Sequence, residues 1–257
     1  GTVGDIEGLP FMEAIRSIRH ELPKTNTMNI HLSLVPYIKA AGELKTKPTQ
    51  HSVQELRRIG ITPHMLVCRT ERELPKALKD KLALACDIDR NAVIEAGDAQ
   101  SIYQVPLQFI KEGILTPLSE HFNIKIKPNM EKWDTLVKNI LLPQGEVTIA
   151  FVGKYLDLKE SYKSLIEALI HAGAHLSTKV NIHWCDSERI EDVGAYDIIG
   201  NSDAILVAGG FGHRGVEGKL AAIKYARENK IPYLGICLGM QLAIIEFAKN
   251  VLGLEDA

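Results

Sequence analysis

Cys237 lies in the stretch of the chain whose residue types most clearly suggest chemistry. Residues 232–241 read Pro-Tyr-Leu-Gly-Ile-Cys-Leu-Gly-Met-Gln, so the cysteine stands between two glycines, after an apolar strand and before a helix predicted over 238–249. Small neighbours permit the sharp, strained strand-to-helix turn of a nucleophile elbow. The helix N-terminus would lower the pKa of the thiol, and the thiolate would attack carbonyl carbons. The alternative, a buried structural cysteine, is disfavoured by the flanking glycines.

A second segment offers the hydrogen-bond donors that acyl transfer needs. An apolar stretch over 203–208 predicts a buried parallel strand, and the run Gly-Gly-Phe-Gly-His-Arg-Gly follows it at 209–215. Consecutive glycines let backbone N–H groups face a ligand. We therefore expect the N–H groups of Gly210 and Leu238 to bind the oxyanion of a tetrahedral intermediate. By itself, without the elbow, the run would be an ordinary glycine-rich loop.

A lysine-containing segment in the first half of the chain suggests phosphate binding. Its ammonium groups, hydroxyls and amide suit a polyphosphate, and the start of the next helix adds backbone N–H groups. From spacing alone, a solvated surface loop is equally favoured. The segment consists of Lys45, Thr46, Lys47, Pro48, Thr49 and Gln50.

The composition limits the classes of protein to which the chain can belong. Its 257 residues are 46% hydrophobic and 24% charged, which is typical of a globular protein of one or two domains. The net charge of −2 gives no strong field toward nucleic acid or a membrane, and no apolar run has the length of a membrane span. The cysteines lack the spacing of a metal site or a disulfide framework, which indicates a reducing cytosol.

Apolar strands alternate with helical patterns along most of the chain, which predicts parallel, doubly wound α/β sheets. The alternation breaks over 124–145, where a helix over 130–140 lies between prolines. We therefore expect two Rossmann-like domains, 1–123 and 146–257, joined by a linker over 124–145. The chain opens without Met and ends just past the helix that follows Cys237, so we expect both domains to be truncated.

Individual elements follow from the periodicity of the apolar residues. A helix is predicted to begin at Pro10, with Phe11, Ile15 and Ile18 on one face, and residues 39–48 are predicted to form a polar loop. Strands are predicted over 29–35, 64–68, 92–95, 147–152 and 180–185, and further helices over 53–59, 76–86, 106–112, 117–122, 160–171 and 218–228.

The segments 209–219 and 232–241 resemble the class I glutamine amidotransferase domain. Two further motifs, Gly-Thr-Val-Gly-Asp-Ile-Glu at 1–7 and Lys-Thr-Lys-Pro-Thr-Gln-His-Ser-Val at 45–53, extend the resemblance over the whole chain to the CTP synthase family. The resemblance implies that 1–123 is the C-terminal part of the synthetase domain and that 146–257 is the N-terminal part of the amidotransferase domain. It implies that a cysteine thiolate releases ammonia from glutamine, that ATP phosphorylates the 4-oxygen of UTP, and that ammonia displaces this phosphate.

The resemblance also implies roles for residues that periodicity does not single out. Lys81, which by periodicity alone is a surface helix residue, joins the 45–50 segment in binding UTP and the inhibitor CTP. Ala99 falls where the family, commonly with valine, contacts the adenine of ATP. CTP ring and ribose contacts are implied for Asp5, Ile6 and Glu7, which could instead be a plain helix N-cap. A glutamine pocket is implied for Gly239, Met240 and Gln241, beside Gly210 and Leu238.

The resemblance implies that some parts of the family's machinery lie outside this sequence. No Gly-x-x-x-x-Gly-Lys-Ser/Thr loop occurs here, and the family carries its ATP loop and Mg²⁺ carboxylates upstream. Its catalytic His and Glu follow the elbow, beyond Ala257, and His213 is not favoured as a base because the family tolerates Tyr there. We therefore expect this stretch alone to be inactive, with no metal site and no tightly bound cofactor of its own.

The implied partners are UTP, CTP, ATP with Mg²⁺, glutamine and the activator GTP, in a cytoplasmic homotetramer without nucleic acid or membrane. Two other functions remain open. One is a different class I amidotransferase, such as a γ-glutamyl hydrolase or a purine-pathway enzyme, which the segment 45–50 argues against. The other is a non-catalytic nucleotide-binding or filament-scaffolding module.

Overall fold

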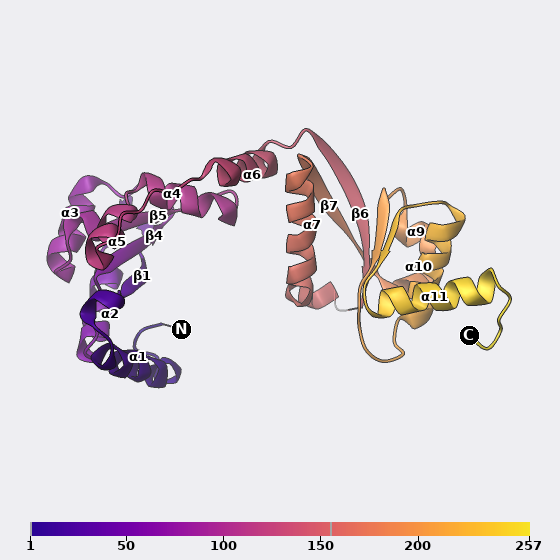
Figure 1. Cartoon of the computed structure of the whole chain (residues 1–257), viewed down its shortest axis with the longest axis horizontal. Coiled ribbons are helices and arrows are strands. Elements are labelled where there is room, and N and C mark those ends of the chain that lie inside the picture. The colour runs from indigo at the N-terminus through magenta and orange to yellow at the C-terminus, as the bar shows by residue number, and fades with distance from the viewer. Residues whose placement is uncertain (1, 155) are drawn as a thin grey trace. The chain divides into compact units, whose positions relative to one another are not determined.

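The structure is a computed structural model that describes residues 2–154 and 156–257, without the side chains of 157 and 159. Gly1, the first residue of the motif at 1–7, lies outside the described residues. The chain divides into two compact units, Gly1–Asp134 and Thr135–Ala257, each with its own hydrophobic core (Figure 1). The domain and linker limits 1–123, 124–145 and 146–257 stay predictions. Helix α6 (Glu131–Leu141) lies within the predicted linker.

A parallel sheet in the order β1-β4-β5 forms the centre of the first unit. Its strands are β1 (Ile30–Leu34), β4 (Met65–Thr70) and β5 (Val93–Gly97). Helix α2 (Lys47–Arg58) connects β1 to β4, and α3 (Lys76–Cys86) connects β4 to β5, so the unit is built from βαβ crossovers. β4 is almost wholly apolar because, as the middle strand, it is buried on both faces.

The first unit contains several further elements. They are η1 (Ile6–Gly8), α1 (Leu9–Glu21), η2 (Lys24–Asn26), β2 (Tyr37–Ile38), β3 (Glu43–Leu44), η3 (Arg90–Ala92), η4 (Ile102–Gln104), α4 (Val105–Lys111) and α5 (Leu115–Phe122). β2 and β3 form an antiparallel hairpin, which Arg72 contacts through its guanidinium, 3.7 Å from the Tyr37 ring centre. Such a cation–π contact ties the hairpin to the segment that follows β4.

The apolar face predicted for α1 is exposed in the structure. Phe11, Ile15 and Ile18 are 69%, 41% and 51% exposed, and no residue of α1 is buried. The periodicity correctly predicted a helix, which begins with a proline in its first turn, but it gave no information about what covers the apolar face.

The second unit is built on a parallel sheet in the order β7-β6-β8-β9, with its first strand inside the sheet. The strands are β6 (Gly145–Gly153), β7 (Thr178–Asp186), β8 (Ala204–Val207) and β9 (Tyr233–Gly235). Because the order reverses at β6, helices lie on both faces, as in a doubly wound fold. Figure 1 shows α7 (Lys163–His175) on one face and α10 (Val216–Glu228) on the other. The prediction of parallel α/β sheets in both halves is thus confirmed.

Neighbouring residues of each central strand point into two different cores of the second unit. Ala150 and Val152 pack with the helices α8 (Ser187–Val193), α9 (Ala195–Ile199), α10 and α11 (Leu238–Asn250). Phe151 points to the opposite face, toward η5 (Leu156–Tyr162) and α7. This alternation is what the period of two in a strand requires when both faces are buried.

A buried ion pair joins α10 to α11. Arg227 donates from Nη2 and Nε to the Glu246 carboxylate at 2.8 Å and 3.0 Å, and Glu246 is only 2% exposed. The hydrogen bonds from Arg227 lower the pKa of Glu246, against the opposing effect of burial, and Asn250 lowers it further. The pair fixes the helix before β9 to the helix after it.

Two regions differ from the sequence-based expectation. The polar loop predicted over 39–48 is partly the β2–β3 hairpin, and helix α2 begins at Lys47 rather than near Val53. Proline in the first turn of a helix leaves no hydrogen bond unmade, so Pro48 starts this helix. Helices α8 and α9 were not predicted. No helix among the described residues is long and apolar enough to cross a membrane.

The packing of Phe151 yields a testable stability difference. Its ring is fully buried, with the Tyr162 and Trp184 rings each 4.9 Å from its centre. Phe151→Ala should lower the free energy of unfolding of the second unit by about 3–5 kcal/mol. Denaturant titration in a Trp133→Phe background checks this, because Trp184 then reports on this unit alone. Phe211→Ala is the matched control: Phe211 is 87% exposed, so its loss should change stability by less than about 0.5 kcal/mol.

Candidate active site

Cys237 has the strained backbone expected of a nucleophile elbow. Its φ is +52° and its ψ is −109°, in the left-handed half of conformational space that residues other than glycine rarely adopt. It follows β9 and Ile236 and occupies the N-cap position of α11, and its side chain is exposed. The strand-to-helix turn therefore presents the sulfur to solvent at the positive end of a helix.

Glycine is required on both sides of Cys237 because backbones meet there. A Cβ on Gly235 would lie 2.6 Å from the carbonyl carbon of Gly239 and 2.6 Å from the Tyr233 hydroxyl oxygen. A Cβ on Gly239 would overlap the carbonyl oxygen of Val207. The Ile236 N–H donates to that same oxygen at 3.0 Å. The turn is thus pressed against the end of β8, and neither glycine has room for a side chain.

The glycine-rich loop that follows β8 packs directly against the nucleophile. A Cβ on Gly209 would stand 3.3 Å from the Cβ of Cys237. The N–H groups of Gly210 and Leu238, the predicted oxyanion donors, donate to no acceptor among the described residues. The structure thus brings the loop beside Cys237, with both groups available to a ligand.

Two lysines that the sequence did not single out contact this loop. Lys219 of α10 is buried and donates from Nζ to the Ala208 carbonyl at 2.9 Å and to the Gly209 carbonyl at 3.4 Å. Lys154, which follows β6, donates to the Phe211 carbonyl. A lysine on a helix is normally expected to face solvent, so the sequence alone did not indicate that Lys219 is buried against these two carbonyls.

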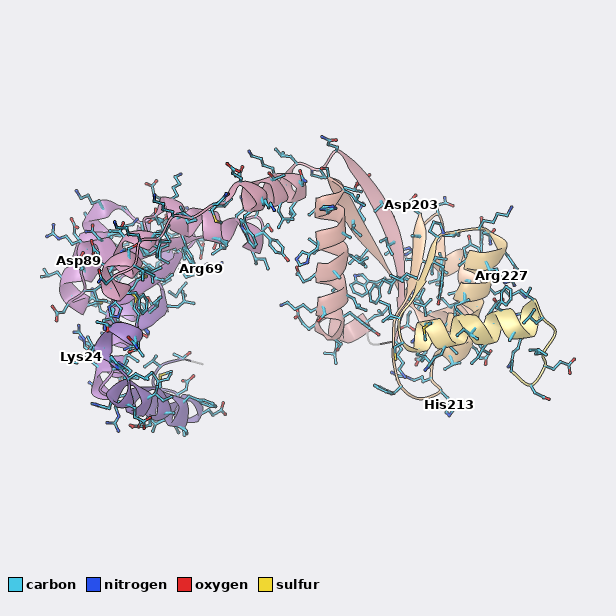
Figure 2. All side chains as sticks on the ribbon, in the orientation of Figure 1. Lys24, Arg69, Asp89, Asp203, His213 and Arg227 are labelled. Atoms are coloured by element: carbon cyan, nitrogen blue, oxygen red, sulfur yellow. The ribbon has the colours of Figure 1, made fainter. Side chains whose placement is uncertain are left out.

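The other glycines and the histidine of the loop have different surroundings. Gly215 and Gly218 pack against Ser187 at the start of α8, where a Cβ on either would overlap Ser187 atoms. His213 is exposed, and Figure 2 shows it pointing outward from the loop. No hydrogen bond in the described part of the chain links a histidine or carboxylate to the Cys237 sulfur.

The residues expected to line a glutamine pocket are placed differently from one another. Gly239 is buried, donates its N–H to Ile236 at 3.0 Å and accepts the Tyr233 hydroxyl at 2.7 Å, so its backbone serves the turn itself. Met240 lines an apolar groove of about 450 Å³ along α11. Gln241 has an exposed side chain, and its N–H closes the first helical turn onto Cys237. Their roles in glutamine binding stay predictions.

In the first unit, one of the predicted phosphate ligands pairs with a carboxylate. The Lys45 ammonium pairs with Glu43 at the end of the β2–β3 hairpin. Lys45, through its hydrogen bond and its charge, lowers the pKa of Glu43, and the charge of Lys81 on α3 lowers it further. Among the described residues, no hydrogen bond or ion pair joins Lys81 to Glu43 or Lys45.

The polar residues at the start of α2 are buried and hydrogen-bonded within the protein. Thr49 donates to the Leu34 carbonyl and accepts from Ser33, both at 3.1 Å, so it ties α2 to β1. Gln50 donates to the Thr46 hydroxyl at 3.2 Å. Lys47 and Pro48, in contrast, are exposed on the first turn of the helix. A role for these residues in binding UTP or CTP stays a prediction.

The remaining predicted contacts lie elsewhere on the first unit. The residues at 5–7 are exposed at η1, and Asp5 accepts from the Thr2 N–H at 3.1 Å. Among the described residues, no hydrogen bond or ion pair joins Asp5 or Glu7 to the lysines of the hairpin. Ala99 follows β5 at the carboxyl edge of the sheet, next to Asp98, which pairs with Arg69 at 2.8 Å. This edge is where parallel sheets commonly bind ligands.

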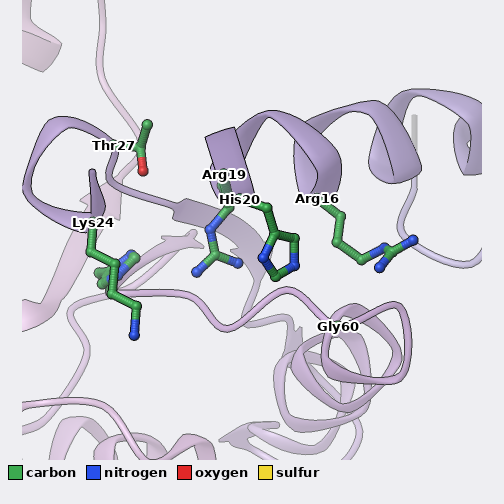
Figure 3. A pocket seen from close by; sticks show the side chains of 7 residues that line it. Arg16, Arg19, His20, Lys24, Thr27 and Gly60 are labelled. Carbon is green, nitrogen blue, oxygen red and sulfur yellow. The ribbon is translucent and has the colours of Figure 1, made fainter. Parts of the chain in front are cut away.

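A basic pocket of about 360 Å³ lies apart from all these residues, beside α1 (Figure 3). Arg19, His20 and Lys24 line it with Arg16, which is already paired with Glu13 at 2.7 Å. None of the residues predicted to bind nucleotide or glutamine lines it. As for a metal, residues 2–154 and 156–257 contain no group of three or more His, Cys, Asp or Glu side chains able to hold one.

Comparison with protein families gives the two units different matches. Residues 1–124 match the family described as CTP synthase N-terminus, and residues 157–256 match glutamine amidotransferase class-I. The unit that carries the cysteine elbow thus matches class I glutamine amidotransferases, and the unit before it in the chain matches the CTP synthase N-terminus.

Three curated relatives that match the whole length of the chain are CTP synthases. The chain is 69% identical to a CTP synthase of Nautilia profundicola over 261 aligned residues, and 66% identical to one of Campylobacter jejuni over 258. A CTP synthase of Wolinella succinogenes is 67% identical. Each alignment covers 100% of this chain and 47–48% of the relative, so the chain spans about half the length of the curated relatives it matches. The resemblance to CTP synthase is confirmed.

A solved structure is also similar to part of the chain. It is the glutaminase domain of Trypanosoma brucei CTPS with bound acivicin, which is 45% identical to this chain. The match covers 43% of each chain, with a TM-score of 0.40.

The cysteines should differ sharply in reactivity. Burial raises the pKa of the Cys68 and Cys185 thiols to about 12 and also raises that of Cys86. At pH 8 these thiols stay protonated and shielded, whereas Cys237 is exposed at a helix N-terminus. Limiting iodoacetamide followed by peptide mapping should find Cys237 alkylated at least about tenfold faster than the others. Equal labelling of several cysteines would contradict the elbow geometry.

Substitution of one flanking glycine should disrupt the turn. The Cβ of Gly235→Ala would meet backbone atoms, which cannot rotate away, so we expect a loss of about 1–3 kcal/mol in unfolding free energy and a loss of selective Cys237 alkylation. Gly145→Ala is the control, because no atom lies within 4 Å of a Cβ at that position. Unchanged stability and alkylation in Gly235→Ala would show that the backbones are not in close contact.

Proposed function

We propose that this chain supplies the glutamine-hydrolysing nucleophile and a nucleotide-binding hairpin of a CTP synthase, which aminates UTP to CTP with ATP and with glutamine as ammonia donor. The observation that carries the proposal is the Cys237 elbow, with a glycine-rich loop packed against it. The CTP synthase N-terminus match of the other unit supports this enzyme over another class I amidotransferase. It likewise gives no support to a non-catalytic module.

The site suggests how glutamine is hydrolysed. The Cys237 thiolate attacks the carbon of the side-chain amide, and the carbonyl oxygen becomes an oxyanion. The N–H groups of Gly210 and Leu238 are available to donate to it. Collapse of the intermediate breaks the C–N bond, and the nitrogen leaves as ammonia after taking up a proton. Water then attacks the thioester, releasing glutamate and the thiol. The resemblance assigns the proton transfers to a His and a Glu, which in the family follow the part that matches this chain.

The hairpin supports binding of a pyrimidine triphosphate in the first unit. Lys45 pairs with Glu43 and its ammonium group suits a polyphosphate, and the resemblance adds Lys81 of α3. The first turn of α2 adds Lys47 and a helix N-terminus, which favours anions. Thr49 and Gln50 hold this turn against β1 rather than reaching outward. Glu43 acts as an internal counter-ion that a phosphate would displace.

Further parts of the proposal rest on the resemblance. They are the contacts of Asp5, Ile6 and Glu7 with CTP, of Ala99 with ATP, and of Gly239, Met240 and Gln241 with glutamine. They also include the domain limits 1–123, 124–145 and 146–257, activation by GTP, a homotetramer and a cytoplasmic location. The resemblance also implies that Mg²⁺ would accompany ATP.

Variants of the hairpin and of the first turn of α2 test the nucleotide site in the full-length protein that contains this chain. Lys45→Ala and Lys47→Ala should each weaken UTP use and CTP inhibition together, because both ligands carry the same triphosphate. A charge-assisted contact contributes roughly 1.5–3 kcal/mol, or about tenfold to a hundredfold in affinity. Lys45→Ala should have the larger effect, because it leaves Glu43 unneutralised. Glu43→Gln should strengthen UTP binding.

The controls separate the nucleotide site from the glutaminase. Lys127→Ala removes an exposed lysine elsewhere on the chain and should change neither UTP use nor CTP inhibition. Basal glutamine hydrolysis should persist in the hairpin variants, whereas Cys237→Ala should abolish it. Steady-state kinetics for UTP, CTP inhibition curves and a glutaminase assay provide the measurements. If both lysines can be removed without effect on UTP or CTP, the hairpin is a solvated surface segment and the nucleotide assignment is wrong.

A further inference from the structure

Lys219 is an unusual feature of the second unit because its ammonium group is buried. The residue is only 1% exposed, and lysine is rarely buried to this extent unless it is paired. Among the described residues it forms no ion pair with a carboxylate. Its hydrogen bonds go to backbone carbonyls, those of Ala208 and Gly209. Burying an ammonium group without a carboxylate partner costs free energy, so we expect a group nearby that the positive charge stabilises.

The bonded carbonyls belong to the loop that faces the nucleophile. Nζ of Lys219 lies 3.4 Å from the position of a Cβ on Gly210, while a Cβ on Gly209 would be 3.3 Å from the Cβ of Cys237. The loop therefore passes between the ammonium group and the elbow. Lys154 bonds the Phe211 carbonyl of the same loop, so side chains hold it at two points.

The geometry of a trans peptide links the Lys219 hydrogen bond to the direction of an N–H group. In such a peptide, the C=O of one residue and the N–H of the next point in opposite directions. No cis peptide bond occurs in the described residues, so the bond between Gly209 and Gly210 is trans. When Lys219 binds the Gly209 carbonyl, the Gly210 N–H must point away from Lys219. That N–H donates to no described acceptor, which leaves it to a ligand.

Lys219 and Cys237 also interact through their charges. Burial lowers the pKa of Lys219, the neighbouring Lys154 lowers it further, and Cys237 raises it. Opposite charges attract, so an ammonium group behind the loop favours negative charge that develops at the elbow. A positive charge fixed in a poorly solvated place acts on developing negative charge more strongly than one in water.

We propose that Lys219 is a positioning residue of the glutaminase site, which orients the Gly210 N–H as an oxyanion donor and places a fixed positive charge behind the loop that faces Cys237. The inference rests on the proposed glutaminase function and adds to it a residue outside the cysteine and glycine motifs. Lys219 touches neither substrate nor the reacting atoms. It acts through the peptide bond between Gly209 and Gly210.

The test compares two variants of Lys219 in the full-length protein that contains this chain. Lys219→Met keeps the length and removes both the charge and the donor, whereas Lys219→Gln keeps a donor without the charge. Glutaminase kcat should fall at least about tenfold in Lys219→Met, with the KM for glutamine changing less than about threefold, because an oxyanion donor acts in the transition state. Lys219→Gln should recover part of this loss. Lys224→Met, at an exposed position of the same helix, is the control.

A second measurement separates orientation from charge. Alkylation of Cys237 by iodoacetamide needs the thiolate but no oxyanion donor, so it should slow equally in the Met and Gln variants. Glutamine hydrolysis, which needs both, should distinguish them. Thermal melting checks the fold. The proposal is overturned if Lys219→Met melts normally and keeps kcat within about twofold, or if both variants fail to fold, which would make Lys219 a structural residue. Absence of glutaminase activity in the unsubstituted protein would instead overturn the proposed function.

Discussion

The close approach of two backbones, at the end of β8 and at the turn from β9 to α11, is the constraint on which the candidate site depends. Gly235 and Gly239 allow it, because any side chain there would overlap backbone atoms that have no rotamer to change. The approach forces the φ of Cys237 to +52°, and the strain is held by hydrogen bonds on both sides of the residue. The exposed sulfur, its place on the helix N-terminus and its contact with the glycine-rich loop all follow from this packing.

The first unit positions its candidate ligands by charge and side-chain hydrogen bonds instead. Thr49 and Thr46 fix the start of α2 from within, and Arg72 on Tyr37 fixes the hairpin from outside. Glu43 pairs with the ammonium group of Lys45, which follows the hairpin. This arrangement constrains the positions of the side chains less than the elbow does, because surface ion pairs contribute little free energy and are screened by salt.

The sequence predicted those features that depend on local residue types. The elbow was predictable because cysteine, glycines, strand and helix lie within ten residues, and α3 was predicted with its observed limits because its periodicity is clear. The β2–β3 hairpin was missed because strands of two residues carry no period. Lys219 was missed because a lysine in a helix normally faces solvent, and only the fold shows that the Ala208 and Gly209 carbonyls, just past the end of β8, make it a buried donor. For α1, the period predicted the apolar face but not its exposure.

Several elements contact the backbone at the end of β8, so substitutions in these elements affect one another. Val207 receives the Ile236 N–H and the close approach of Gly239, while the next two carbonyls, of Ala208 and Gly209, receive Lys219. The Arg227–Glu246 pair joins the helix carrying Lys219 to the helix that follows Cys237. Substitutions that share partners do not combine additively. Residues far apart in the chain are therefore epistatic, and a change tolerated at one of them depends on which residues occupy the others.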